Sequence, residues 1–268
     1  MSRLFSVHLG YVLGSLPMAE RFRRARDLGF TAVEIPFPYD TPAADYARHL
    51  RDTGLKQISI GAPTTDYRKG EPGLAVDPAR RTDFRASLEK ARAYALTIGA
   101  PAIHVFSGGR NPALPDATMA ATYRDNLAFA ADLFARDGIA TLIEPINATD
   151  FKGYWLDSMD AARDVIAGLG RSDIGIIFDA YHVAMMGRDP ATAIAATAPF
   201  VRHVQFADYP GRHEPGTATL DFTALVAAMR AANYDGTAGL EYIPTRDVLQ
   251  PFVLPDALAE YAELRAVE

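Results

Sequence analysis

The chain has 268 residues, with 27 basic side chains, 33 acidic side chains and no cysteine. The formal net charge of −6 provides no basic excess for phosphate contacts, so nucleic acid is not an expected partner. The lack of cysteine excludes disulfides, zinc–thiolate sites, iron–sulfur clusters and a cysteine nucleophile. No run approaches the roughly 18 apolar residues of a membrane span, and the N-terminus lacks a signal-peptide pattern, so we expect a cytoplasmic protein without membrane partners.

Short apolar runs alternate with amphipathic stretches along the chain. Several runs are apolar at odd and even positions alike, which is typical of parallel strands buried on both faces. The expected strands are Phe5–Leu9, Ala32–Ile35, Gln57–Ile60, Ala102–Phe106, Thr141–Ile146, Ile174–Asp179, Val201–Phe206 and Ala238–Tyr242. The expected helices are Met18–Leu28, Asp83–Ile98, Thr118–Arg136, Met159–Leu169, Thr223–Ala232 and Pro255–Val267, with His49 solvated on a further surface helix.

Eight strands in a chain of this length correspond to roughly 33 residues per unit, the size of a βα module. We therefore predict an α/β protein with one domain over residues 1–268, a (β/α)8 TIM barrel whose active site lies at the C-terminal ends of the strands. A doubly wound sheet is the alternative, but no G-x-G-x-x-G follows the first strand. The long segment from Gly61 to about Pro78 is predicted to be a lid or substrate loop.

Polar residues gather at or near the ends of the predicted strands. They are Glu34, His104, Glu144, Asp179, His182, His203, Gln205 and Glu241. Several carboxylates buried together need a compensating cation, and carboxylate and amide oxygens suit Mg²⁺ or Mn²⁺. We therefore predict a divalent metal ion held by Glu144, Asp179, Gln205 and Glu241.

The histidines of these strands leave alternatives open. Gln205 is favoured over His203 as the metal ligand because it is nearer the C-terminal end of its strand, with His203 one layer deeper. His104 lies inside an apolar strand and would more readily be a core residue, although we include it with Glu34 among the expected substrate-binding residues. His8 could belong to the core or the site. The same two possibilities hold for the aromatic residues Tyr11, Phe37, Tyr39 and Trp155.

The segment after the seventh predicted strand, residues 207–217, combines turn-forming residues with Arg212, His213 and Glu214. Its position at the catalytic end favours an anion-binding role over an ordinary polar turn. The planar guanidinium of Arg212 can bind both oxygens of a substrate carboxylate.

Several motifs together resemble one known family. They are E-P-I-N from Glu144, D-x-Y-H from Asp179, H-x-Q-x-A-D-x-P-G-R-H-E-P-G-T from His203, G-x-E-Y-x-P from Gly239 and G-F-T-A-V-E-I-P-F-P-Y-D from Gly29. The resemblance is to the hydroxypyruvate isomerase family, within the xylose isomerase-like TIM barrels of the sugar isomerase and epimerase superfamily. It implies that Glu144, Asp179, Gln205 and Glu241 hold the metal, that Glu144 and Glu241 form the acid–base pair, and that His182 and Arg212 contact substrate oxygens.

Two segments depart from the family pattern. Residues 61–66 read Gly-Ala-Pro-Thr-Thr-Asp where a Gly-Asp-Trp type of segment is usual, and residues 106–110 read Phe-Ser-Gly-Gly-Arg where a more apolar segment is expected. Both would shape the pocket, so they leave the substrate open.

The expected reaction is a metal-assisted proton transfer next to a carbonyl through an enediolate, most simply the isomerisation of hydroxypyruvate to tartronate semialdehyde. A 2-oxo-tetronate isomerase and a ketose 3-epimerase are alternatives with the same chemistry. A non-catalytic protein that binds a sugar or keto acid is an alternative of another class, and a homo-oligomer is left open. A DNA-repair endonuclease of the same superfamily is disfavoured by the net charge of −6.

Overall fold

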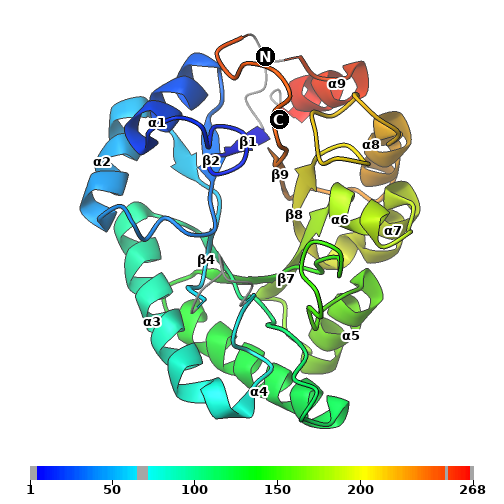
Figure 1. The fold of residues 1–268 in the computed structure, drawn as a ribbon. Helices are drawn as coiled ribbons and strands as arrows, with labels where there is room; N and C mark the ends of the chain where they lie inside the picture. The colour runs from blue at the N-terminus through cyan, green and yellow to red at the C-terminus, as the bar shows by residue number, and fades with distance from the viewer. Residues whose placement is uncertain (1–4, 65–71, 251–252, 266–268) are drawn as a thin grey trace.

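A parallel sheet curls around a central axis, and helices cover its outer side (Figure 1). The computed structural model describes residues 5–64, 72–250 and 253–265. The order of the strands is β3-β2-β1-β9-β8-β7-β6-β5-β4, and all neighbours are parallel. The strands are β1 (Phe5–His8), β2 (Ala32–Glu34), β3 (Lys56–Gln57), β4 (Ile60–Gly61), β5 (Ala102–His104), β6 (Ala140–Ile143), β7 (Ile174–Asp179), β8 (Val201–Phe206) and β9 (Thr237–Leu240).

The ring closes through β3 and β4, which are two pieces of the predicted strand Gln57–Ile60. β3 pairs with β2 on one side, and β4 pairs with β5 on the other. Backbone hydrogen bonds from Ile58 N to Val33 O at 2.9 Å and from Ala62 N to His104 O at 2.8 Å continue these two ladders. The predicted barrel is therefore confirmed, and the doubly wound alternative is wrong because such a sheet keeps two free edges.

The predicted strands and helices are found with small differences at their ends. β7 and β8 have the predicted bounds, while β1, β2, β5, β6 and β9 end before the predicted Leu9, Ile35, Phe106, Ile146 and Tyr242. The helices are α1 (Met18–Asp27), α2 (Ala43–Thr53), α3 (Arg81–Ile98), α4 (Asp116–Ala135), α5 (Met159–Leu169), α6 (Ala180–Met185), α7 (Pro190–Thr197), α8 (Phe222–Ala231) and α9 (Asp256–Arg265). The predicted end of the last helix at Val267 lies outside the described residues.

Two short helices between β7 and β8 were not predicted. α6 starts directly after β7 because the Asp179 side chain accepts hydrogen bonds from the backbone N–H groups of Tyr181 at 2.8 Å and His182 at 3.3 Å. α7 begins at Pro190, with Asp189 as its cap. Neither helix is long enough to show a clear apolar period in the sequence.

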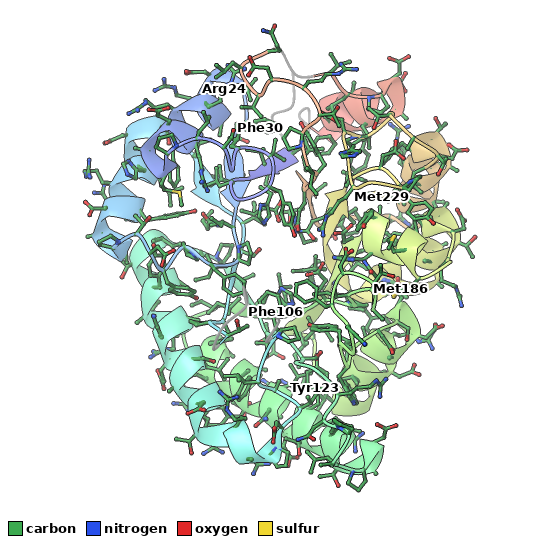
Figure 2. The ribbon with its side chains drawn as sticks, in the orientation of Figure 1. Arg24, Phe30, Phe106, Tyr123, Met186 and Met229 are labelled. Carbon is green, nitrogen blue, oxygen red and sulfur yellow. The ribbon has the colours of Figure 1, made fainter. Side chains whose placement is uncertain are left out.

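The strands are buried on both faces, as their composition indicates. Every residue of β1 and of β7 is buried. Phe5 of β1 meets Phe206 of β8 edge to face, with ring centroids 5.6 Å apart. Figure 2 shows side chains filling the ring of helices, with Phe106 near its middle. This packing gives the strand ends a rigid support.

The segment after β4 is described only in part, because residues 65–71 lie outside the described residues. Its second half is tied to the chain after β5, since Gly73 bridges Ser107 and Val76 N donates to Ser107 O at 3.0 Å. The predicted role of this segment as a lid or substrate loop stays a prediction. In the part of the chain that the structure describes, no helix has the length and apolar character needed to cross a membrane.

Candidate active site

A small pocket opens where the strands end, and it gathers most of the residues singled out in the sequence. Its free volume is about 40 Å³, and a single water needs about 10–15 Å³ by this kind of measure. The predicted site residues that line it are Glu34, His104, Glu144, His182, Gln205, Arg212 and Glu241. Asp179 joins them through Arg212, whose Nη2 lies 2.7 Å from Asp179 Oδ2.

A wider cavity of about 650 Å³ adjoins this pocket and shares His8 and Tyr11 with it. Phe37 and Tyr39 line the wider cavity, and Tyr11 lines both. Trp155 instead packs against Tyr123, with ring centroids 5.0 Å apart, and lines neither space. The small pocket therefore lies next to a larger space that is lined in part by aromatic side chains.

Besides Glu34, three buried carboxyl groups share the pocket region, those of Glu144, Asp179 and Glu241. Burial raises the pKa of Glu144 well above its usual value, and the nearby charges of Glu241 and Asp179 raise it further. Burial likewise raises the pKa of Asp179 to about 7 and that of Glu241 to about 7, although Arg212 acts in the opposite direction on both. One arginine therefore does not offset three carboxylates at neutral pH, and a further cation would favour their ionised forms.

Arg212 lies between two of these carboxyl groups. Its Nη2 donates to Asp179 Oδ2 at 2.7 Å and to Glu241 Oε1 at 2.6 Å. Its guanidinium carbon lies 4.6 Å from the ring centroid of Tyr11 and 5.1 Å from that of Tyr181. Two of the four predicted metal ligands are thus paired with this buried arginine.

The donor atoms of the pocket that Arg212 leaves free are suited to a divalent cation. Gln205 Oε1 is buried and has no hydrogen-bond partner among the described residues. Glu144, Asp179 and His182 offer ligand atoms that all lie within 4.8 Å of one another. These oxygen-rich donors fit a hard cation such as Mg²⁺ or Mn²⁺. His182 belongs to this group although the sequence did not suggest it as a ligand, and Glu241 stands outside the group.

The carboxylate of Glu34 links three side chains beneath the pocket by hydrogen bonds. Its Oε2 accepts a hydrogen bond from Gln205 Nε2 at 2.8 Å and lies 3.0 Å from His203 Nε2, while its Oε1 accepts from Ser6 Oγ at 2.8 Å. Burial opposes ionisation of Glu34, but the contacts with His203 and Ser6 prevail and lower its pKa to about 2. Because His203 Nδ1 also lies 2.7 Å from Thr237 Oγ1, both ring nitrogens of His203 are engaged below the pocket.

Glu34 also depends on a glycine of strand β9, which lies on the other side of β1. A Cβ atom built on Gly239 would lie 2.0 Å from Glu34 Oε1 and 2.4 Å from Ser6 Oγ. Only a residue without a side chain leaves room for the carboxylate there. The glycine of the G-x-E-Y-x-P motif is therefore explained by packing against Glu34.

Two further histidines face the pocket. The ring of His104 packs against that of Phe106 in a tilted arrangement, with centroids 3.8 Å apart. Its Nδ1 lies 3.5 Å from Glu144 Oε2, and burial lowers its pKa to about 3. His8 was left undecided by the sequence, but it lines the pocket and burial lowers its pKa to about 4. The sequence signal for His8 was its position near the end of the predicted strand Phe5–Leu9, and in the structure it pairs in register with Glu34.

Arg212 is the one residue of the segment 207–217 that lines the pocket. Asp208 organises the segment, since its carboxylate accepts hydrogen bonds from the backbone N–H groups of Gly216, Ala218 and Leu220 at 2.8–3.0 Å. His213 and Glu214 bind the chain after β9 instead: His213 Nδ1 lies 2.9 Å from Ile243 O, and Glu214 Oε1 accepts from Thr245 N. Their contribution to the site is to hold the loop that carries Arg212.

The fold and this pocket at the strand ends define a class of protein. A family model described as xylose isomerase-like TIM barrel matches residues 22–263. The chain belongs to this family.

Curated relatives narrow the comparison. A 2-oxo-tetronate isomerase of Cupriavidus necator is 37% identical over 90% of this chain and 92% of its own length. A putative hydroxypyruvate isomerase of Homo sapiens is 36% identical over 92% and 91%, and the hydroxypyruvate isomerase of Escherichia coli is 31% identical over 90% and 93%. We therefore place the chain among the isomerases of this family.

Solved structures share the fold. A structure described as an AP endonuclease, family 2, from Brucella melitensis has a TM-score of 0.88 and 32% identity, over 92% of this chain and 95% of that one. A structure of L-ribulose 3-epimerase has a TM-score of 0.75 at 22% identity, over 99% and 93% of the two chains. The second likeness concerns the fold alone.

Proposed function

We propose that this protein is a metal-dependent aldose–ketose isomerase of small hydroxy-keto acids, and that it converts hydroxypyruvate to tartronate semialdehyde. One observation carries the proposal: Glu144 and Glu241, both with raised pKa, line one small pocket together with Gln205, whose amide oxygen has no hydrogen-bond partner in the part of the chain that the structure describes. The relatives named hydroxypyruvate isomerase support the choice of substrate.

The metal ion is proposed to be Mg²⁺ or Mn²⁺, held by Glu144, Asp179, Gln205 and Glu241. When bound, a divalent cation would stabilise negative charge on the carbonyl and hydroxyl oxygens of the substrate. Occupation by the cation requires Arg212 to release Asp179 and Glu241, or to share them. In that arrangement its guanidinium becomes available to the substrate carboxylate.

Glu144 and Glu241 are proposed to move the proton. One carboxylate takes the proton from C3 of hydroxypyruvate, the C–H electron pair forms the C2–C3 double bond, and the carbonyl π pair becomes an oxyanion on O2. The other carboxyl group then delivers a proton to C2 and the O3 proton passes to O2, so that O3 becomes the aldehyde oxygen and O2 the new hydroxyl. Raised pKa values suit both residues to this exchange near neutral pH.

The other pocket residues are proposed to bind the substrate. Arg212 and His182 contact its oxygens, because they are the donors that stand beside Asp179 and Glu144. Glu34 and His104 complete the wall, with Glu34 acting mainly through Gln205 because both of its oxygens already accept hydrogen bonds. The small pocket volume suits a substrate of few atoms.

A 2-oxo-tetronate isomerase is the second candidate. The Cupriavidus necator relative carries that name, and the adjoining cavity of about 650 Å³ would accept a longer chain. The same proton transfer would then occur between C3 and C2 of a four-carbon acid.

The proposal is tested by turnover of hydroxypyruvate, 2-oxo-tetronate and a panel of ketoses with protein reconstituted with Mg²⁺ or Mn²⁺. We expect the highest kcat/KM for hydroxypyruvate, no turnover after exhaustive EDTA treatment, and recovery when metal is returned. A higher kcat/KM for 2-oxo-tetronate selects the second candidate, and full activity of metal-free protein overturns the metal assignment. Tight keto-acid binding without turnover would instead indicate a binding protein.

The description of the Brucella melitensis structure makes DNA a control substrate. The net charge of −6 opposes duplex binding, and the buried Arg212 is engaged with carboxylates. We expect no mobility shift and no cleavage of duplex DNA that contains an abasic site. Specific cleavage of that duplex would contradict the isomerase proposal.

A further inference from the structure

The amide of Asn147, in the loop after β6, has a fixed orientation. Asn147 is buried, and its Oδ1 accepts hydrogen bonds from the backbone N–H groups of Thr149 at 3.0 Å and Asp150 at 2.9 Å. Its Nδ2 lies 3.0 Å from Asp150 Oδ2. Turning the amide over would set its nitrogen against two N–H donors and its oxygen against a carboxylate, so three contacts agree on one orientation.

This orientation places an N–H group of Asn147 against Nδ1 of His182. Asn147 Nδ2 has two hydrogens: one points to Asp150, and the other faces His182 Nδ1 at 2.6 Å. A ring nitrogen that accepts a hydrogen bond carries no proton, so the single proton of the neutral ring lies on Nε2. That Nε2 is 3.8 Å from Glu144 Oε1 and 3.6 Å from Asp179 Oδ2, between two carboxylates of the site.

We propose that Asn147 is a positioning residue that keeps the ring proton of His182 on Nε2, so that His182 donates a hydrogen bond to a substrate oxygen. The tautomer follows from the contacts alone, whereas the substrate oxygen that receives the bond rests on the proposed function. A fixed, neutral donor at this place stabilises charge that develops on the substrate as the C–H bond breaks. It also removes His182 from the possible metal ligands, because a protonated Nε2 has no free lone pair.

Two groups compete with this arrangement. Arg212 Nη1 lies 3.3 Å from His182 Nε2 and is also a donor, so it favours the opposite tautomer. Asp150 Oδ2 lies 3.9 Å from His182 Nδ1, which is beyond hydrogen-bond distance, and favours that tautomer more weakly. The ring has one proton and cannot accept at both nitrogens. The contact with Asn147 is shorter and its amide cannot turn, whereas Arg212 is bound mainly through Nη2 to Asp179 and Glu241.

His8 provides an internal reference in the same pocket. Its Nδ1 accepts hydrogen bonds from the backbone N–H groups of Gly10 at 3.1 Å and Tyr11 at 2.9 Å. The proton of His8 therefore also lies on Nε2, but backbone groups fix it. No side-chain substitution at position 147 alters that arrangement.

The test is the ¹⁵N chemical shifts of the histidine ring nitrogens in the full chain, with and without Mg²⁺, with the His182 signals assigned by their loss in His182→Gln. The informative variant is the double exchange Asn147→Asp with Asp150→Asn. It keeps the net charge and one amide–carboxylate pair, but it places a carboxylate oxygen against His182 Nδ1. Asn126→Asp is the matched control, because Asn126 is a buried amide that bonds Ala75 O at 2.8 Å, away from the site.

We expect the Nε2–H form of His182 in the wild type and the Nδ1–H form in the double exchange. His8 should stay Nε2–H in both proteins, and Asn126→Asp should leave the His182 signals unchanged. A wild-type His182 in the Nδ1–H form, a charged ring, or a tautomer that the exchange does not alter would overturn the proposal.

Activity provides a second readout. The double exchange turns Nε2 from a donor into an acceptor, so kcat should fall by about 100-fold, the cost of losing one donor to a developing oxyanion, with little change in KM. If the wild-type protein does not turn over hydroxypyruvate, the proposed function is wrong. The tautomer of His182 is then still decided by the ¹⁵N chemical shifts of its ring. A normal kcat with a reversed tautomer would show that His182 donates nothing in the reaction.

Discussion

Gln205 Nε2 donates a hydrogen bond of 2.8 Å to Glu34 Oε2, and this bond leaves the amide oxygen of Gln205 as the atom available to the pocket. Glu34 is itself fixed by Ser6 and His203. A carboxylate on β2 thus orients an amide on β8, and that amide presents its oxygen where a divalent cation is proposed to bind. Residues that orient metal ligands commonly change metal affinity when they are replaced.

Glu34→Gln should weaken Mn²⁺ binding by about 10- to 100-fold, because its amide nitrogen can approach Gln205 and no longer selects one orientation of that side chain. Isothermal titration calorimetry with Mn²⁺ measures the effect. Ser6→Ala is the matched control, since it removes one hydrogen bond from Glu34 and leaves the bond to Gln205 intact. An unchanged affinity in Glu34→Gln would mean that Gln205 needs no such orientation or is not a ligand.

The two proposed acid–base residues should give different defects when each is changed to glutamine. Both Glu144→Gln and Glu241→Gln should lower kcat by about 100- to 10,000-fold. The variant that lacks the proton donor should still exchange the C3 hydrogens of hydroxypyruvate with D₂O, whereas the variant that lacks the base should not. Circular dichroism and Mn²⁺ titration serve as controls for the fold and the metal site. Wild-type turnover by either variant would remove that residue from the reaction.

The raised pKa values predict a pH-dependent stability of the metal-free protein. The pKa of Asp179 and that of Glu241 are each about 7 in the folded protein, above their usual values of 3.8 and 4.5. The folded state therefore binds more protons than the unfolded state at intermediate pH, and the contribution of these groups is lost as the pH rises through about 7. The free energy of unfolding should fall from pH 5 to pH 8, and Mg²⁺ should oppose the fall.

Urea denaturation of the metal-free protein measures this dependence. The double variant Asp179→Asn with Glu241→Gln is the reference, because its amides do not titrate. Its stability should fall less than that of the wild type over the same pH range. Equal slopes for the two proteins would show that these carboxyl groups are already ionised at low pH.

Gly239→Ala should destabilise the protein by about 1–3 kcal/mol, the usual cost of overpacking a filled interior. The new methyl group would meet Glu34 Oε1 and Ser6 Oγ, so Mn²⁺ affinity should fall as well through the displaced Gln205. Gly168→Ala in α5 is the matched control, because no atom lies within 4 Å of the added carbon and alanine favours a helix. Equal stability of the two variants, measured by urea denaturation, would contradict the packing account.

The barrel could be predicted because several of its strands are buried on both faces and carry apolar residues at odd and even positions alike. β7 is buried throughout, and it was predicted with its observed bounds, as was β8. The division of the third strand into β3 and β4 could not be predicted, since it depends on which neighbour each half pairs with. Short helices such as α6 depend on a single capping residue, Asp179, and leave no periodic pattern.

The candidate site was predictable to the extent that strand ends meet at one edge of a barrel. That rule gathers Glu144, Gln205 and Glu241, and it also applies to His8. It does not indicate that Arg212 bridges two of the carboxylates, because a loop residue's position depends on tertiary contacts. Nor does it indicate the fixed amide of Asn147, whose orientation comes from backbone groups of its own turn.

The central claim is proton transfer between neighbouring carbons by a pair of glutamates. It is tested most directly by proton NMR of hydroxypyruvate in D₂O with Mg²⁺-loaded wild-type protein. The account predicts tartronate semialdehyde with deuterium at C2 from the first turnovers, because the carboxyl group that delivers the proton exchanges with solvent. Folded, metal-loaded protein that forms no tartronate semialdehyde and exchanges no C3 hydrogen would contradict it.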